Sequence, residues 1–175
     1  MDQDRMNAVE LLMVEHASLR LHFQYARKTA NWDSIYEIED FVRNCHARSE
    51  DEVVFPQLQK EFVRSSNQET LKILSRLEAD HKLIDTIGDQ IKSRTVQGDT
   101  ETLRKRILLY ANTVESHNSS EEALIFQYWK NLDTTIDESA QNSVSLFRQI
   151  IQDYGLNRYF QITGISEKLL DSVHK

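Results

Sequence analysis

The chain has few of the residues that interrupt helices. Its 175 residues include one proline and four glycines, and no stretch is rich in glycine or serine. Proline and glycine are the least favourable residues inside a helix. Charged residues make up 28% of the chain. This composition favours ordered helix over disorder, and the length suits one domain with a buried core.

Cysteine is almost absent. The single Cys45 excludes an internal disulfide and a cysteine-based zinc cluster, and we expect it to be a small buried apolar residue in a reducing compartment. No run approaches 18 apolar residues, and the acidic start MDQDRMN lacks the basic and apolar parts of a signal peptide. We therefore expect a cytoplasmic protein without a membrane partner.

Clusters of basic residues are also missing. The formal net charge is −7, and lysine and arginine are scattered along the chain. Proteins that bind nucleic acids neutralise phosphates with clustered positive side chains. The sequence therefore argues against a nucleic-acid partner, whereas its acidity suits cations.

Apolar residues recur at helical spacing in four segments, which predicts an all-α, antiparallel four-helix bundle. The apolar positions are Val9, Leu12, Leu19, Phe23 and Ala26; Ile35, Ile38, Val42 and Val53; Leu71, Leu74, Leu77, Ile84 and Ile91; and Leu103, Ile107, Tyr110, Val114, Leu124 and Tyr128. We expect Pro56 to bend or end the second helix. A capping box from Ser66 to Glu69 should open the third, and the fourth should run on through YWKNL.

The chain continues beyond these four segments. A fifth amphipathic helix should end at Gly155, and apolar residues follow it. We expect residues 1–133 to form the bundle and residues 134–175 to form a helical extension packed on it. The protein would be a monomer, or a homodimer through this extension.

Each apolar stripe has a gap that a polar residue fills. The residues in the gaps are His16, His46, Glu50, His81, His117 and Glu121. A lone histidine on such a stripe is often a core residue that bonds to a carbonyl or a water, but a glutamate is almost never buried without a partner. The set therefore predicts a metal site. His22 lies off its stripe and His174 is near the end of the chain, so we expect both to be solvated.

The number and type of ligands limit the choice of metal. A histidine and a glutamate four residues apart lie on one helix face, so both can reach a common ion. Four imidazoles and two carboxylates are too many donors for one zinc ion and too nitrogen-rich for calcium or magnesium. They suit two transition ions with bridging carboxylates, and both iron and manganese fit. Glu15, Glu78 and Glu115 could orient imidazoles, and Tyr110 could pack or donate to an oxygen ligand.

Four segments resemble the signatures of the hemerythrin-like, or HHE cation-binding, domain: LLMVEHASL, CHARSEDEVVFP, LEADHKL and ESHNSSEEALIF. The resemblance covers roughly residues 8–130. The second segment is especially similar to the hemerythrin-like domains of plant iron-responsive ubiquitin ligases. The resemblance implies a non-haem di-iron site, bridged by oxide or hydroxide when oxidised. Its terminal ligands would be His16, His46, His81 and His117, and its bridges Glu50 and Glu121.

The chain departs from the oxygen-carrying members of that family. They have a fifth histidine one turn from the lone one in the third helix, where this chain has Leu77 and Asp85, and an aspartate where this chain has Glu122. We therefore expect a protein that senses or handles iron, oxygen, nitric oxide or redox state, and not a simple reversible oxygen carrier. The alternative is a di-iron oxidase or peroxidase that consumes oxygen or hydrogen peroxide.

Overall fold

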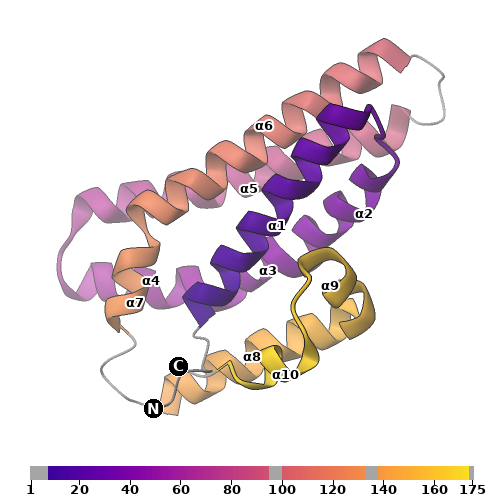
Figure 1. Ribbon diagram of the computed structural model, residues 1–175. Helices are drawn as coiled ribbons and strands as arrows, with labels where there is room; N and C mark the ends of the chain where they lie inside the picture. The colour runs from indigo at the N-terminus through magenta and orange to yellow at the C-terminus, as the bar shows by residue number, and fades with distance from the viewer. Residues whose placement is uncertain (1–7, 95–99, 133–137, 174–175) are drawn as a thin grey trace.

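The computed structural model describes residues 8–94, 100–132 and 138–173, and the secondary-structure elements within these ranges are all helices. Four helical arms run side by side, as Figure 1 shows, and confirm the predicted all-α bundle. The proposed boundary between residues 133 and 134 lies outside the described ranges, as does His174. The arms are α1 (Ala8–Thr29); α2 (Ser34–Phe41), η1 (Val42–His46), α3 (Ala47–Ser49), η2 (Glu50–Val54) and α4 (Phe55–Arg64); α5 (Gln68–Arg94); and α6 (Thr100–Leu124).

The apolar stripes meet in one core. Most of the predicted stripe residues are buried there, together with aromatic rings such as Phe23, Phe41 and Phe55. A buried side chain of this size contributes about 1.5–3 kcal/mol relative to an exposed one. Cys45 is also fully buried, as predicted. The core therefore fixes the rotation of each helix about its axis, and with it the direction in which the polar gap residues point.

The second arm passes through Pro56 without ending. Proline lacks an N–H group, and its ring would clash with the carbonyl four residues earlier in an α-helix. The turn before it, η2, is a π-helix, in which the backbone N–H of Phe55 donates to the carbonyl of Glu50. This wider turn gives the ring room, so the helix continues to Arg64.

Two predicted helix ends need correction. The Ser66 to Glu69 capping box does not form: Ser66 has φ 55°, and the side chain of Asn67 accepts the N–H of Thr70 instead. The fourth arm does not run straight through YWKNL, because it breaks at Ile125 before α7 (Phe126–Leu132) begins.

The break at Ile125 also changes which residues reach the core. Ile125 and Phe126 turn inward and are 0% and 3% exposed. Leu124 and Tyr128, which the helical period assigns to the core, are 41% and 37% exposed. Because of the kink, Ile125 and Phe126 occupy the core in place of Leu124 and Tyr128.

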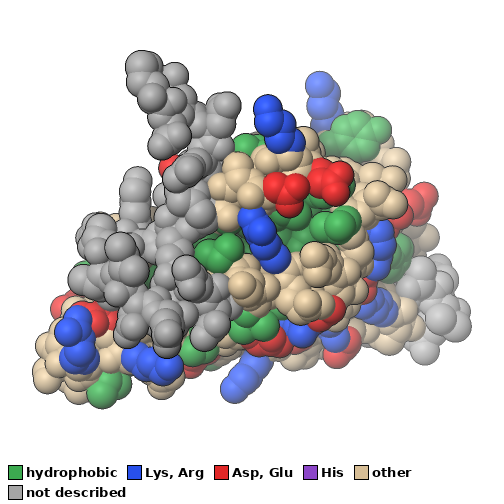
Figure 2. All heavy atoms as spheres, turned by 90° about the horizontal axis from the view of Figure 1, so that it is seen from below, with side chains coloured by type: hydrophobic (Ala, Val, Ile, Leu, Met, Phe, Trp, Pro, Cys, Tyr) green, Lys and Arg blue, Asp and Glu red, His purple; other side chains and the backbone are tan. Residues whose placement is uncertain are grey.

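The C-terminal helices lie beside the bundle (Figure 1). They are α8 (Glu138–Tyr154), α9 (Leu156–Thr163) and α10 (Glu167–Asp171). Gly155 ends α8 as predicted, with φ 108°. Helix α8 packs against η1, α3 and η2, and α9 packs against α1 and α2. The face seen from below in Figure 2 mixes acidic and basic side chains, and no histidine is visible on it.

Away from the polar gaps of the stripes, a buried carboxylate joins α2 to α5. Glu39 is 1% exposed and forms ion pairs with Arg43 and Lys92. A Cβ atom built on Gly88 would lie 2.5 Å from Glu39 Oε1 and 3.0 Å from its Cγ. The glycine therefore provides the space in which Glu39 makes these pairs.

We expect Gly88→Ala to destabilise the protein by about 1–3 kcal/mol, the usual cost of overpacking a filled site. The direction of this change is informative, because replacing glycine by alanine inside a helix normally stabilises a protein by about 0.5–1 kcal/mol. Urea unfolding of the two proteins measures the difference. In a Glu39→Ala background the same change should become neutral or stabilising, since the clash is gone. A destabilisation that persists in that background would contradict this account of Gly88.

Candidate metal centre

All six polar residues predicted from the gaps in the stripes meet at one place in the bundle. Their donor atoms form two overlapping groups, each with all donor atoms within 4.8 Å of one another. One group contains His16, His46, Glu50 and Glu121, and the other contains Glu50, His81, His117 and Glu121. The four imidazoles thus form two pairs, and both carboxylates belong to both groups.

The two carboxylates lie between the histidine pairs. Glu50 directs Oε1 toward His46 Nε2, at 3.5 Å, and Oε2 toward His81 Nε2, at 3.3 Å. Glu121 directs Oε1 toward His117 Nε2, at 3.2 Å, and Oε2 toward His16 Nε2, at 3.6 Å. Each carboxylate therefore presents one oxygen to each pair, which is the arrangement of a bridging ligand.

Among the described residues, the inward Nε2 atoms of His81 and His117 lie 2.9 Å apart and pair with one another. The other inward atoms have no hydrogen-bond partners there: they are Nε2 of His16 and His46 and all four carboxylate oxygens of Glu50 and Glu121. Buried polar groups are normally paired, since each unpaired one costs about 1–3 kcal/mol. Unpaired atoms of this kind, converging from four side chains, fit metal ions as their missing partners.

The outward nitrogen of each imidazole faces a carboxylate. For His16, His46 and His81 the carboxylate is within hydrogen-bond distance, and because a carboxylate only accepts, Nδ1 carries the proton and Nε2 faces the centre. Nδ1 of His117 is too far from Asp80 for a hydrogen bond and has no such partner among the described residues. The acid in each case comes from a different arm, where it is the sequence neighbour of another candidate ligand. The Nδ1 to oxygen distances are 2.7 Å from His46 to Glu15, 2.8 Å from His81 to Asp51, 2.8 Å from His16 to Glu122 and 3.7 Å from His117 to Asp80.

The sequence predicted only some of the carboxylates that face the imidazoles. Of the acids proposed to orient imidazoles, Glu15 does so. Glu115 instead pairs with Arg27, and in α5 it is Asp80, and not Glu78, that faces an imidazole. Asp51 and Asp80 were missed, although each lies next to a candidate ligand in the sequence. That adjacency was the available signal.

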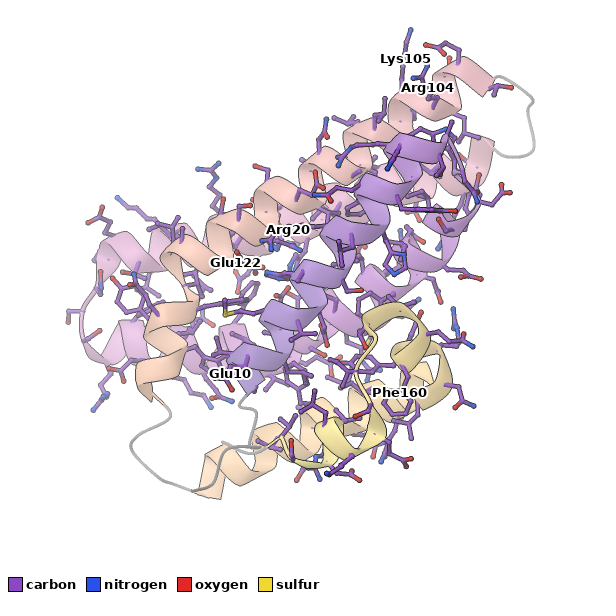
Figure 3. All side chains as sticks on the ribbon, in the orientation of Figure 1. Glu10, Arg20, Arg104, Lys105, Glu122 and Phe160 are labelled. Carbon is purple, nitrogen blue, oxygen red and sulfur yellow. The ribbon has the colours of Figure 1, made fainter. Side chains whose placement is uncertain are left out.

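Glu122 has a second partner besides His16. Arg20 of α1 forms an ion pair with the same carboxylate oxygen, and the two side chains lie toward one another between α1 and α6 in Figure 3. Arg20 and the hydrogen bond from His16 hold Glu122 on the outer side of the imidazole. The hydrogen bond from His16, followed by that from Arg20, lowers the pKa of Glu122 to about 2.

Two other residues named from the sequence lie outside the six. His22 is not solvated as predicted, because it is half-buried and its Nε2 lies 3.0 Å from the carbonyl oxygen of Ile162 in α9. Tyr110 packs in the core with its ring 6.2 Å from that of Phe23. Its hydroxyl has no hydrogen-bond partner among the described residues.

Two of the candidate ligands sit on irregular backbone. His46 closes the π-helical turn η1, and Glu50 opens the π-helical turn η2. Such turns shift the direction of a side chain relative to a regular α-helix and are frequent at functional sites. In this arm His46 and Glu50 are buried at the centre, and Val42 and Val53 are buried in the core.

The pKa values of the buried side chains describe the centre without a metal ion. Burial would lower the pKa of His16, but hydrogen bonds to Glu122 and Glu50 outweigh it and raise the pKa to about 9. For His81, burial is outweighed in the same way by Asp51 and Glu50, and the pKa rises to about 10. Burial, and then the charge of Glu50, raise the pKa of Glu121. Protons thus balance the carboxylates in the metal-free chain.

One side of the centre is closer to solvent than the other. His16 and His46 are 0% and 1% exposed, whereas His81 and His117 are 6% and 4% exposed. A surface pocket of about 250 Å³ reaches His117. Its lining residues are Arg76, Asp80, Asn112, Thr113, Ser116 and His117. The surface therefore reaches one of the six side chains between α5 and α6.

The helical fold and these six convergent side chains fit a metal-binding bundle. Residues 7–129 match the family described as the hemerythrin HHE cation-binding domain. Because the match spans more than half of the sequence, the chain belongs to this family. Comparison with curated proteins and with solved structures gives no match. Among the described helices, none combines the length and the apolar character needed to cross a membrane.

The raised histidine pKa values predict how the metal-free protein responds to pH. The folded chain holds protons on His16 and His81 that the unfolded chain releases above the ordinary pKa of 6.5. This contribution to stability is complete below about pH 6.5 and is lost as the pH rises through 9 to 10. We expect the free energy of unfolding to fall between pH 7 and 10, measured by urea denaturation with a chelator present.

The metal-loaded protein is the control for this pH prediction. Ligand imidazoles must be neutral at Nε2 to bind a metal, so the loaded chain should show a weaker decline over the same pH range. Metal addition at pH 7 should also release protons. A metal-free stability that stays level or rises from pH 7 to 10 would contradict the assignment.

Proposed function

We propose that this chain is a non-haem di-iron protein. Two imidazoles would hold each iron, and Glu50 and Glu121 would bridge the two ions. The terminal ligands would be His16, His46, His81 and His117. The single observation that carries the proposal is that both buried carboxylates present one unpaired oxygen to each histidine pair.

The donor set favours iron. Each ion would receive two imidazoles together with carboxylate oxygen, and two histidines with carboxylate and open positions are typical of non-haem ferrous iron. Zinc prefers a closed tetrahedral set in structural sites, and calcium and magnesium prefer oxygen alone. Manganese remains the alternative metal, because it accepts the same carboxylates but gains less from imidazole.

The function that follows is sensing or handling of a small molecule in the cytoplasm. When bound, iron would supply reversible electron transfer and open positions for dioxygen, nitric oxide or peroxide. The chain's own residues fix the imidazoles through their Nδ1 protons and exclude water with the surrounding core. The pocket beside His117 is the side from which a small ligand would arrive.

A di-iron oxidase or peroxidase is the second candidate. The observation in its favour is the same access route, since an enzyme needs turnover of its small ligand. The pocket of about 250 Å³ lies below the size usual for organic ligands, about 300–1,000 Å³. Dioxygen or peroxide would therefore be the substrate, and sustained consumption of either by the iron-loaded protein would favour the enzyme.

Variants at the six ligands test the site. We expect two iron ions per chain after reconstitution without air, roughly 3.5–4 Å apart as in other two-metal sites. His46→Ala and His117→Ala should each lose at least one ion, because each removes a buried inward nitrogen. Metal analysis and X-ray absorption measure the number and separation of the ions. The control is His22→Ala, which should retain both, and equal losses from all three variants would contradict the ligand set.

The reaction with oxygen tests the redox proposal. Carboxylates near both ions make the ligand set hard and anionic, which favours ferric over ferrous iron. The diferrous protein should therefore oxidise in air, and its charge-transfer bands should persist after the oxygen is removed under argon. Full return of the diferrous spectrum without a reductant would instead identify a reversible carrier. An unchanged spectrum on reduction and reoxygenation would indicate a metal without a redox role.

A further inference from the structure

The C-terminal extension reaches one of the proposed ligands through two hydrogen bonds. The hydroxyl of Tyr159, in α9, donates to Oε1 of Glu15 at 2.7 Å. The other oxygen of Glu15 accepts the Nδ1 proton of His46, also at 2.7 Å. Tyr159 and Glu15 are 0% exposed and His46 is 1% exposed, so water does not compete for these bonds. A continuous chain of contacts therefore runs from α9 to the inward nitrogen of His46.

Other contacts hold α9 in place. Arg158 forms an ion pair with Asp40 of α2. The carbonyl of Ile162 accepts hydrogen bonds from Ser18 and from His22, both in α1. Phe160, labelled in Figure 3, lies on the same short helix, with its ring 6.1 Å from that of Tyr159. Since α9 is attached on both sides of Tyr159, the phenol has a fixed position relative to Glu15.

The support from α9 reaches only one histidine pair. The carboxylate that faces His81 belongs to Asp51, which is 48% exposed, and the one near His117 belongs to Asp80, which is 30% exposed. These acids can exchange partners with water. Glu15 has no such freedom, because it is buried and its hydrogen bonds run to His46 and Tyr159.

We propose that Tyr159 is a positioning residue for His46, acting through Glu15, so that the C-terminal extension forms part of the metal centre. This inference rests on the proposed function, since it assumes that His46 binds one of two metal ions. Without the phenol, Oε1 of Glu15 would be an unpaired charged oxygen in a dry site. The carboxylate would then rotate, and the His46 ring would lose its fixed orientation.

The test compares two tyrosine variants of the full chain. Tyr159→Phe removes the hydroxyl that bonds to Glu15, whereas Tyr154→Phe removes a buried hydroxyl in α8 that has no hydrogen-bond partner among the described residues. Loss of a group that orients a ligand imidazole usually lowers metal affinity by about 10- to 100-fold. We expect a loss of this size in Tyr159→Phe for one of the two ferrous ions, measured by anaerobic competition with a chelator, and no loss in Tyr154→Phe.

A spectroscopic measurement separates positioning from a general loss of stability. In the Mössbauer spectrum of the ⁵⁷Fe-loaded protein, Tyr159→Phe should change half of the iron signal, and Tyr154→Phe should change none. Glu15→Gln should affect the same half, because the amide lacks the charge that holds the Nδ1 proton. Equal weakening of both ions, or a change in both halves of the signal, would show a structural effect only and overturn the inference.

Hydrogen exchange provides the reciprocal test. If α9 raises metal affinity, metal binding must stabilise the docking of α9 by the same factor. The amides of α9 should exchange more slowly in iron-loaded than in metal-free wild-type protein, and this difference should shrink in Tyr159→Phe. Wild-type protein that binds no iron would defeat the proposed function itself. Two ions of unchanged affinity and spectrum in Tyr159→Phe would defeat this inference alone.

Discussion

Two fully buried carboxylates, Glu50 and Glu121, lie between four imidazoles, and the arrangement of the bundle depends on satisfying them. A buried charge without a partner costs several kcal/mol, so these side chains require either protons or metal ions nearby. The metal-free chain uses protons, held on histidines such as His16. Metal ions would replace those protons and bring four helices to one point, so binding and folding are linked.

The carboxylates on the outer side of the imidazoles follow a closed pattern around the bundle. The acid beside a candidate ligand in each arm faces the imidazole of the next arm in chain order, and the last arm returns to the first; three of these contacts are hydrogen bonds, and Asp80 lies 3.7 Å from His117. Glu15, for example, precedes His16 but supports His46. Each arm therefore carries both a candidate ligand and the acid that faces a candidate ligand of the next arm. A rotation of one helix would disturb two imidazoles, which makes the helix positions mutually dependent.

The helical period was sufficient to predict the four arms and the six residues that meet between them, because a regular α-helix places a gap residue on the same face as its apolar neighbours. It failed where the backbone departs from that period. The kink at Ile125 moves Leu124 to the surface, and the π-helical turns around His46 were not predicted. The contacts between helices could not be predicted from the sequence either. The partner of Asp51, for example, depends on how two arms pack.

Tyr159 shows why the extension could not be interpreted from sequence alone. Its position in α9 indicates burial, but a buried tyrosine can pack against any part of the bundle. Its partner Glu15 is separated from it by most of the chain, and only the packing of α9 on α1 brings them together. The two histidine pairs therefore have different surroundings, although their sequence segments are alike. One pair is closed by the extension, and the other faces the pocket beside His117.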